Sequence, residues 1–185
     1  MFNLVTRFQA ATNQALTASV IITGVVIALT ILQLFKDDVW NLQTTQVTNF
    51  KPTSNWKYSY QYGSINRKPK ENTKLQFNLK TDLSHLFNWN TKQIFIYLTA
   101  EYPGKSTGSS NKITYWDKII TNPNDAKLDL KNQKSKYSVY DVEKSFRERN
   151  ATVRLEWNIQ PHIGPLIYGS TEELGQFQFV TNEKK

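Results

Sequence analysis

The sequence predicts a mostly β protein, in which a single N-terminal transmembrane helix is followed by an antiparallel β-sandwich domain. Two observations lead to this prediction. Residues Ala15 to Phe35 form an uncharged run in which 12 of the 21 positions are Leu, Ile, Val or Phe. Most of the following sequence consists of short segments in which apolar and polar side chains alternate, separated by turn-forming residues. The first pattern is typical of a membrane span, and the second of half-buried strands.

The apolar run has the length of a membrane span. At about 1.5 Å per residue, 20 helical residues cover roughly 30 Å, the thickness of a bilayer's hydrocarbon core. A cleaved signal peptide has a shorter apolar stretch and small residues before its cleavage site, and no such pair follows Gln33. We therefore expect an uncleaved signal-anchor over residues 15–35, with a buried core helix as the alternative. Gly24 and Ala28 give it a candidate face for close helix packing.

The orientation of this span follows from a modification motif. Positive charges near the two ends are balanced, since Arg7 and the amino terminus face Lys36 and Lys51. Asn150 begins the only Asn-x-Ser/Thr motif, and such an asparagine must face the secretory lumen to be glycosylated. We therefore expect a single-pass type II protein, with residues 1–14 as a cytosolic tail and residues 36–185 as one lumenal domain.

Composition restricts the chemistry. The net charge is +8, but the basic residues are spread along the chain, so anionic lipid headgroups or an acidic partner are favoured over nucleic acid. With no cysteine, disulfides, zinc fingers and thiol chemistry are excluded.

The alternating pattern places the strands. They are expected at residues 44–50, 57–62, 74–80, 93–101, 113–121, 127–130, 137–141, 152–159 and 176–181. The segment Gln93–Glu101 is apolar on both faces, which is typical of a strand in the middle of a sheet. Residues 102–111 are expected to form an exposed loop and residues 122–125 a tight turn. Trp89, Trp116 and Trp157 are expected in the core.

A search for catalytic groups gives a weak candidate. Asp82, Ser84 and His85 contain the residue types of a hydrolase triad, but triad members usually come from separate segments. We expect a short helical turn over residues 82–90, capped by Asp82 or Ser84, and a turn at His162. The sequence therefore predicts no catalytic residue, no metal site and no cofactor. A membrane-tethered lumenal hydrolase and a glycan- or peptide-binding module remain the alternatives.

Several motifs are similar to those of a known family. They are Asp82-Leu83, Leu86–Asn90, Lys92–Tyr102, Trp116–Ile120, Asn150–Leu155, Trp157-Asn158 and Pro161. On these residues and the N-terminal anchor, the chain resembles the signal peptidase complex subunit 3 family, glycosylated accessory subunits of the endoplasmic reticulum signal peptidase. The likeness is weaker between Asn41 and Lys74 and at the C-terminus.

The resemblance implies a location and a set of partners. It implies an endoplasmic reticulum membrane protein that binds the catalytic signal peptidase subunit and other subunits of the complex, and meets nascent precursors indirectly. It also implies that the nucleophilic serine belongs to the catalytic partner and that Asn150 is glycosylated. Six motif residues are candidates either for partner contact or for locking the sandwich, with the second interpretation favoured: Asn88, Trp89, Asn90, Trp116, Asp117 and Lys118.

Overall fold

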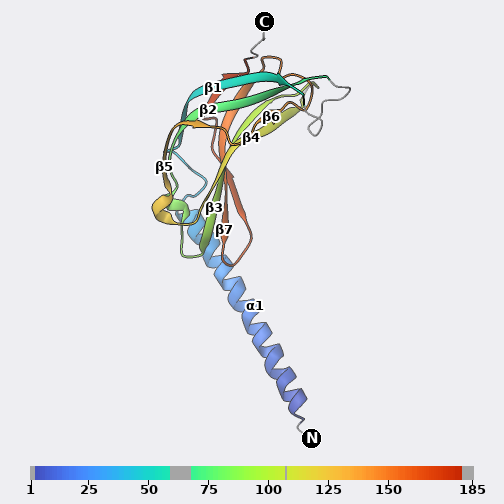
Figure 1. Ribbon diagram of the computed structural model, residues 1–185. Coiled ribbons are helices and arrows are strands. Elements are labelled where there is room, and N and C mark those ends of the chain that lie inside the picture. The colour runs from blue at the N-terminus through green and yellow to red at the C-terminus, as the bar shows by residue number, and fades with distance from the viewer. Residues whose placement is uncertain (1–2, 59–67, 107, 181–185) are drawn as a thin grey trace.

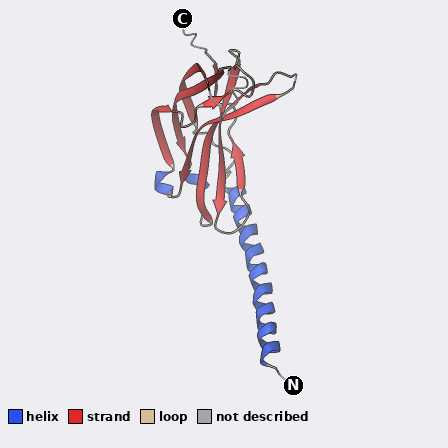
Figure 2. Ribbon diagram, turned by 45° about the vertical axis from the view of Figure 1, so that its right-hand side comes forward, coloured by secondary structure: helices blue, strands red, loops and turns tan. Residues whose placement is uncertain are grey.

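The computed structural model describes residues 3–58, 68–106 and 108–180, and it shows a long helix that carries a β domain at its C-terminal end (Figure 1). Helix α1 spans Leu4–Lys36. The strands are β1 (Gln46–Lys57), β2 (Lys70–Asp82), β3 (Thr91–Pro103), β4 (Ser110–Ile120), β5 (Lys127–Lys134), β6 (Val139–Tyr140), β7 (Asn150–Pro161), β8 (Ile167–Ser170) and β9 (Gly175–Gln178). Two 3-10 turns, η2 (Ser84–Leu86) and η3 (Pro123–Asp125), connect strands near the helix (Figure 2).

Within the described residues the strands form two antiparallel sheets. The first sheet has the order β1-β2-β5, with β6 also paired to β2. The second sheet has the order β4-β3-β7-β8, with β9 also paired to β7. The predicted helix followed by an antiparallel β-sandwich is therefore confirmed.

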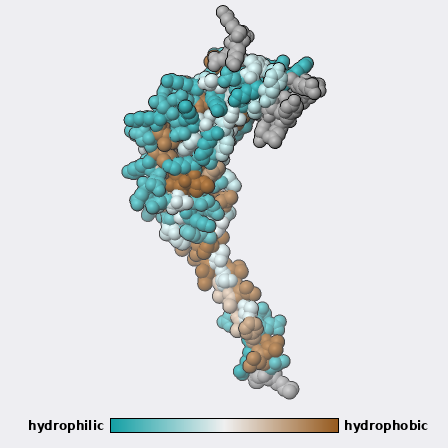
Figure 3. Space-filling view, viewed as in Figure 1, coloured by the Kyte–Doolittle hydropathy of each residue, from teal (hydrophilic) through white to brown (hydrophobic). Residues whose placement is uncertain are grey.

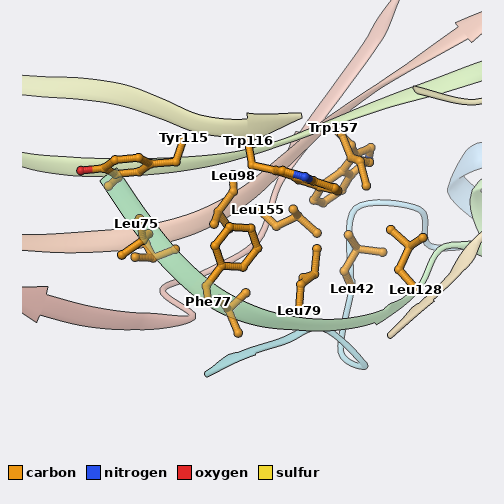
Figure 4. Close-up of a cluster of buried hydrophobic side chains, with 14 of the residues drawn as sticks. Leu42, Leu75, Phe77, Leu79, Leu98, Tyr115, Trp116, Leu128, Leu155 and Trp157 are labelled. Atoms are coloured by element: carbon orange, nitrogen blue, oxygen red, sulfur yellow. The ribbon is translucent and has the colours of Figure 1, made fainter. Parts of the chain in front are cut away.

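The sheets enclose one apolar core, seen in the close-up of Figure 4. Phe77 of β2 meets Trp116 of β4 edge to face, with ring centroids 6.1 Å apart. Trp157 of β7 is 1% exposed and lies in the same core as Leu155, two residues before it (Figure 4). Each large side chain buried in this way contributes about 1.5–3 kcal/mol to folding. The core therefore holds the two sheets in a fixed relation without disulfides.

Strand β3 is central to the second sheet, as its two-sided apolar pattern predicts. It pairs with β4 on one edge and β7 on the other. Ile94, Ile96 and Leu98 are fully buried toward the core, whereas Phe95 and Tyr97 lie half-buried on the outer face. The rings of this outer pair stack at 5.3 Å.

Several predicted boundaries are wrong. The segment 57–62 does not begin a strand, because β1 runs through Lys57 and ends there; residues 59–62 lie outside the described residues. The predicted loop 102–111 starts too early, since Tyr102 is 1% exposed within β3. Its ring packs edge to face on Phe146 and Phe179, which an isolated strand pattern cannot reveal. Strand β8 is missed because Gly169 interrupts its short apolar pattern.

The expected burial of Trp89 is also wrong. Trp116 and Trp157 are buried as predicted, but Trp89 is 58% exposed. It lies between η2 and β3, at the end of the domain nearest to α1, where the chain turns. The apolar neighbours Leu86 and Phe87 pack toward the core and leave the indole outside it.

Candidate functional site

The helix and the sandwich are joined by packing. Leu34, in the last turn of α1, is 1% exposed and belongs to the same core cluster as the strands. Val39 and Leu42, in the connection to β1, are buried in that cluster as well. The domain core therefore continues into the end of the helix, so the helix is not attached through a free linker. We call this region the joint.

Asn90 is the polar centre of the joint. Its Nδ2 group donates to Thr30 Oγ1 of α1 at 2.8 Å and to the Ile163 carbonyl at 2.8 Å. Its Oδ1 accepts from the Ile163 amide at 3.1 Å, and its own carbonyl accepts from the His162 amide at 2.7 Å. Asn90 is only 2% exposed. A single buried side chain thus ties α1, the start of β3 and the turn after β7 together.

Two further contacts support the joint. The Trp40 indole donates to the Tyr168 carbonyl of β8 at 3.2 Å, and its ring lies 5.0 Å from that of Phe35. A β-carbon built on Gly164 would lie 3.4 Å from Ile27, so the β7–β8 turn touches the helix one turn further from the domain than Thr30. The helix is therefore held at several levels along its last three turns.

The rest of α1 is mostly exposed, and it is mainly apolar from Ala15 onward. The helix is long and apolar enough to cross a membrane. The hydroxyls of Thr12, Thr17 and Ser19 donate to carbonyls three or four residues earlier, which removes unpaired donors from its surface. Gly24 and Ala28 lie on this exposed surface.

The candidate triad has a structural geometry. Asp82, Ser84 and His85 line a groove of about 430 Å³ beside the connection that follows α1. Asp82 Oδ1 accepts from the Ser84 amide at 3.0 Å, and its Oδ2 pairs with Lys127 Nζ at 3.3 Å. These hydrogen bonds from Ser84, reinforced by Lys127, hold the pKa of the Asp82 carboxyl below its ordinary value. The carboxylate thus closes a local turn and pairs with a lysine, while His85 is exposed to solvent. The predicted cap is wrong, because the helical turn covers only Ser84–Leu86 and its N-cap position is Leu83, with no side-chain cap hydrogen bond.

No group of three His, Asp or Glu side chains among residues 3–58, 68–106 and 108–180 is placed to hold a metal ion.

Asn150 lies at the end of the domain opposite the helix. It begins β7 and pairs with Gln178 of β9, near the described C-terminal end (Figure 1). The Asn150 side chain is exposed. The preceding Arg149 is fixed by Nη1 donating to the Pro103 carbonyl at 2.7 Å and by an ion pair with Asp141 at 3.2 Å. A glycan on Asn150 would therefore extend from a rigid edge, away from the membrane side.

The six motif residues are placed in different environments. Asn88 closes a turn, since its Oδ1 accepts from the Asn90 amide at 2.9 Å and from Thr91 Oγ1 at 2.9 Å. Trp116 is buried, and Asp117 pairs with Lys136 at 3.2 Å. Lys118 is half-buried opposite Ile96.

The outer face of the second sheet carries a row of side chains near the joint that is apolar except for one asparagine. Ile119, Phe95, Asn158 and Tyr168 are consecutive cross-strand partners on β4, β3, β7 and β8. Ile119 and Tyr168 are 53% and 60% exposed. We call these four residues and Tyr97, which stacks on Phe95, the outer row.

Tyr97 of the outer row lies next to a buried carboxylate, that of Glu156. Lys112 pairs with Glu156, and Thr99 Oγ1 donates to the same carboxylate at 2.8 Å. Burial acts to raise the pKa of Glu156, but the hydrogen bonds from Lys112 and Thr99 outweigh it and hold that pKa below its ordinary value. Burial and this carboxylate together raise the pKa of Tyr97 to about 12.

Sequence reasoning missed two residues of the joint. Thr30 reads as a polar interruption of the apolar run, and Ile163 as part of a turn. They meet through Asn90 although they lie 60 and 73 positions from it in the chain. The sequence marks Asn90 only by its place in the Leu86–Asn90 motif, and that motif does not identify its partners.

The fold and the joint define a class of protein: a β-sandwich domain fixed to one apolar N-terminal helix. Residues 1–182 match the family model described as signal peptidase subunit. The chain is 67% identical to signal peptidase complex subunit 3 of Debaryomyces hansenii over 180 residues, which cover 97% of this chain and 95% of the relative. It is 38% identical to the subunit of the same name from Saccharomyces cerevisiae over 185 residues, covering 100% and 98%. The chain belongs to the signal peptidase subunit family.

Proposed function

We propose that this chain is a non-catalytic subunit of the endoplasmic reticulum signal peptidase complex. In this proposal it is needed for the removal of signal peptides from nascent secretory and membrane proteins, because it binds, positions or stabilises the catalytic subunit. Residues 1–14, which include the first turns of α1, lie in the cytosol, residues 15–35 of α1 span the membrane as a type II anchor, and the sandwich lies in the lumen. The observation that carries the proposal is the joint, considered together with family membership.

The joint suits a positioning role. Peptide-bond cleavage requires a flexible substrate segment to be held next to a catalytic serine, and small misplacements of reacting groups lower rates by orders of magnitude. A sandwich that shares its core with the helix is held in a fixed orientation relative to that helix. A partner bound to such a domain would therefore also be held in a fixed position relative to the helix.

The groove at η2 supports the non-catalytic assignment. A serine hydrolase needs its histidine oriented by a carboxylate. Here the Asp82 carboxylate is oriented by the Ser84 amide and by Lys127. The groove is therefore built around a hydrogen-bonded turn and an ion pair.

The outer row is our candidate surface for the catalytic subunit. It lies near the joint, where a peptidase acting at the membrane surface would be placed, and it offers exposed Ile119 and Tyr168 next to stacked rings. Interfaces commonly bury such aromatic and aliphatic side chains at their centre. Trp89, also exposed, is the residue of the six motif positions that is freest to meet another surface.

The proposal is tested by purifying the full chain from its native membrane in mild detergent, through a tag on this chain. We expect a serine-type signal peptidase subunit to copurify and the purified material to cleave a precursor. The chain purified alone should not cleave it. The substitutions Ser84→Ala, His85→Ala and His162→Ala should leave both assembly and cleavage intact.

Each outcome has a defined meaning. Cleavage by the chain alone, or its loss in His85→Ala with normal assembly, would favour the membrane-tethered hydrolase. Saturable binding of a glycan or peptide without a copurifying peptidase would favour a binding module. A photo-crosslinker at Ile119 should capture the peptidase, whereas one at Val142, which is 73% exposed on the opposite end of the domain, should not.

A further inference from the structure

We propose that the base of the sandwich enters the lipid bilayer. The turn between β7 and β8, which carries Ile163 and Leu166, is embedded in the bilayer leaflet that faces the domain. Trp89 lies at the level of the headgroups of that leaflet. This inference shares with the proposed function the premise that α1 spans the membrane, but it does not require a catalytic partner, because it uses only the helix and the surface around the joint. It assigns to the domain a lipid-binding surface in addition to the helical anchor.

The first argument is depth. The uncharged apolar run ends at Phe35, and Lys36 is the first charge after it. At about 1.5 Å per residue, Thr30 lies about 7.5 Å inside that boundary and Ile27 about 12 Å inside it. Asn90 is hydrogen-bonded to Thr30, and the turn at Gly164 lies next to Ile27, since a β-carbon added at Gly164 would be 3.4 Å from it. If the apolar run fills the hydrocarbon core, the turn at Gly164 is below the membrane surface.

The alternative position of the helix is unfavourable. To keep the turn in water, the hydrocarbon core would have to end near Ile27, and a 20-residue span would then begin near Phe8. That shift places polar side chains in lipid: Gln9, Thr12, Asn13 and Gln14. It also leaves Leu29, Leu32 and Phe35 in water, where they are 53%, 66% and 67% exposed. Both changes oppose the shift.

The second argument is that three backbone groups at the start of the turn are paired within the protein. An unpaired backbone polar group costs several kcal/mol in hydrocarbon, so each internal bond lowers the cost of placing this segment at membrane depth. Asn90 accepts from the amides of His162 and Ile163 and donates to the Ile163 carbonyl. Pro161 and Pro165 have no amide hydrogen to satisfy. Asn90 thus removes unpaired groups from the turn.

The third argument is the character of the surface. Ile163 and Leu166 are 42% and 46% exposed beside the apolar helix. Figures 1 and 2 both show the lower ends of β3 and β7 beside the top of α1. In Figure 3 the brown surface of the helix continues up to the base of the domain, below a mainly teal surface. Trp89 has the amphipathic ring that is enriched at membrane interfaces.

The embedding is one-sided. The groove on the η2 side of the joint is lined by Asp37, Asp38 and Asp82, whose charges keep that side in water. In Figure 1 the two 3-10 turns lie to the left of the helix and the β7–β8 turn to the right. The domain is therefore tilted toward the bilayer on its β7–β8 side. Exposed Lys36 and Lys92 flank the base, where they can meet lipid phosphates.

The absence of cysteine from the sequence makes a depth measurement direct. The full chain is reconstituted in phosphatidylcholine vesicles as Ile163→Cys, Leu166→Cys or Trp89→Cys, each labelled with an environment-sensitive fluorophore. Phe35→Cys is the reference within the membrane and Val142→Cys the control at the far end of the domain. Quenching is measured with spin-labelled lipid and with aqueous iodide.

We expect labels at 163 and 166 to be quenched by spin-labelled lipid to within about twofold of the Phe35→Cys label, and to resist iodide. The label at 89 should respond to both quenchers. Thermal unfolding of each variant shows that it is folded, and Leu166→Cys keeps the test valid if Ile163→Cys disturbs the joint. Iodide quenching at 163 and 166 equal to that of Val142→Cys would overturn the proposal.

Discussion

The substitution Asn90→Ala should loosen the joint and lower the stability of the whole domain. It removes three side-chain hydrogen bonds, one to Thr30 Oγ1 and two to the backbone of Ile163. Each contributes about 1 kcal/mol net, so the free energy of unfolding should fall by about 3 kcal/mol. For a chain of this size 1 kcal/mol corresponds to roughly 2–4 °C, so the melting temperature should fall by about 6–12 °C.

Thr30→Val tests how much of the stability lost in Asn90→Ala comes from the hydrogen bond between helix and domain. Valine keeps the shape of threonine and removes only the bond to Asn90 Nδ2 across the joint and the bond to the Val26 carbonyl. We expect a loss of about 2 kcal/mol, about 1 kcal/mol for each bond. In the double variant the two losses should not add, and the coupling energy should be about 1 kcal/mol.

The assay is thermal unfolding of the full chain in mild detergent, followed by intrinsic tryptophan fluorescence. Asn55→Ala, on the exposed side of β1, is the matched control and should change the free energy of unfolding by less than about 0.5 kcal/mol. Additive losses in the double variant, or an Asn90→Ala protein as stable as the control, would refute the reasoning that Asn90 couples helix and domain.

Three further predictions concern other parts of the domain. Gly169→Ala should lower the free energy of unfolding by about 1–3 kcal/mol, because its β-carbon would lie 2.4 Å from the buried Trp157 ring; Gly24→Ala, whose β-carbon meets nothing within 4 Å, should not lower it. The folded-state pKa of Glu156 lies below its ordinary 4.5, so its stabilisation is present above pH 4.5 and lost on acidification. Denaturant titrations should show a steeper acid loss for the wild type than for Glu156→Gln, and parallel curves would contradict this. When both proteins are expressed with microsomes, the wild type treated with endoglycosidase should migrate like untreated Asn150→Gln. A wild type whose migration the enzyme does not change would contradict glycosylation at Asn150.

The sequence predicts the architecture well because the architecture rests on local patterns. The span is marked by an uninterrupted absence of charge, and β3 by apolar residues on both faces. Both signals lie within one segment and need no knowledge of a partner. The helix begins earlier than predicted, at Leu4, because Asn3 caps it by accepting from the Val5 amide at 3.3 Å, and helix formation does not require an apolar sequence.

The joint could not be predicted, because it depends on contacts between segments that are far apart in the sequence. Asn90, Thr30 and Ile163 are ordinary residues in their own segments, and their roles arise only when the fold brings these segments together. Trp89 shows the same limit, since its apolar neighbours predict burial but the turn after η2 directs it outward. Long-range contacts decide both cases.

The central claim, that the sandwich is held at a fixed position by its helix, is tested most directly by a distance measurement in the bilayer. Spin labels are placed at Ser19→Cys on α1 and Val142→Cys on the domain, both exposed positions in a chain without native cysteine. Double electron–electron resonance should give one narrow distance distribution, which broadens in Asn90→Ala. A distribution that is already broad in the unmodified joint would contradict a rigid connection.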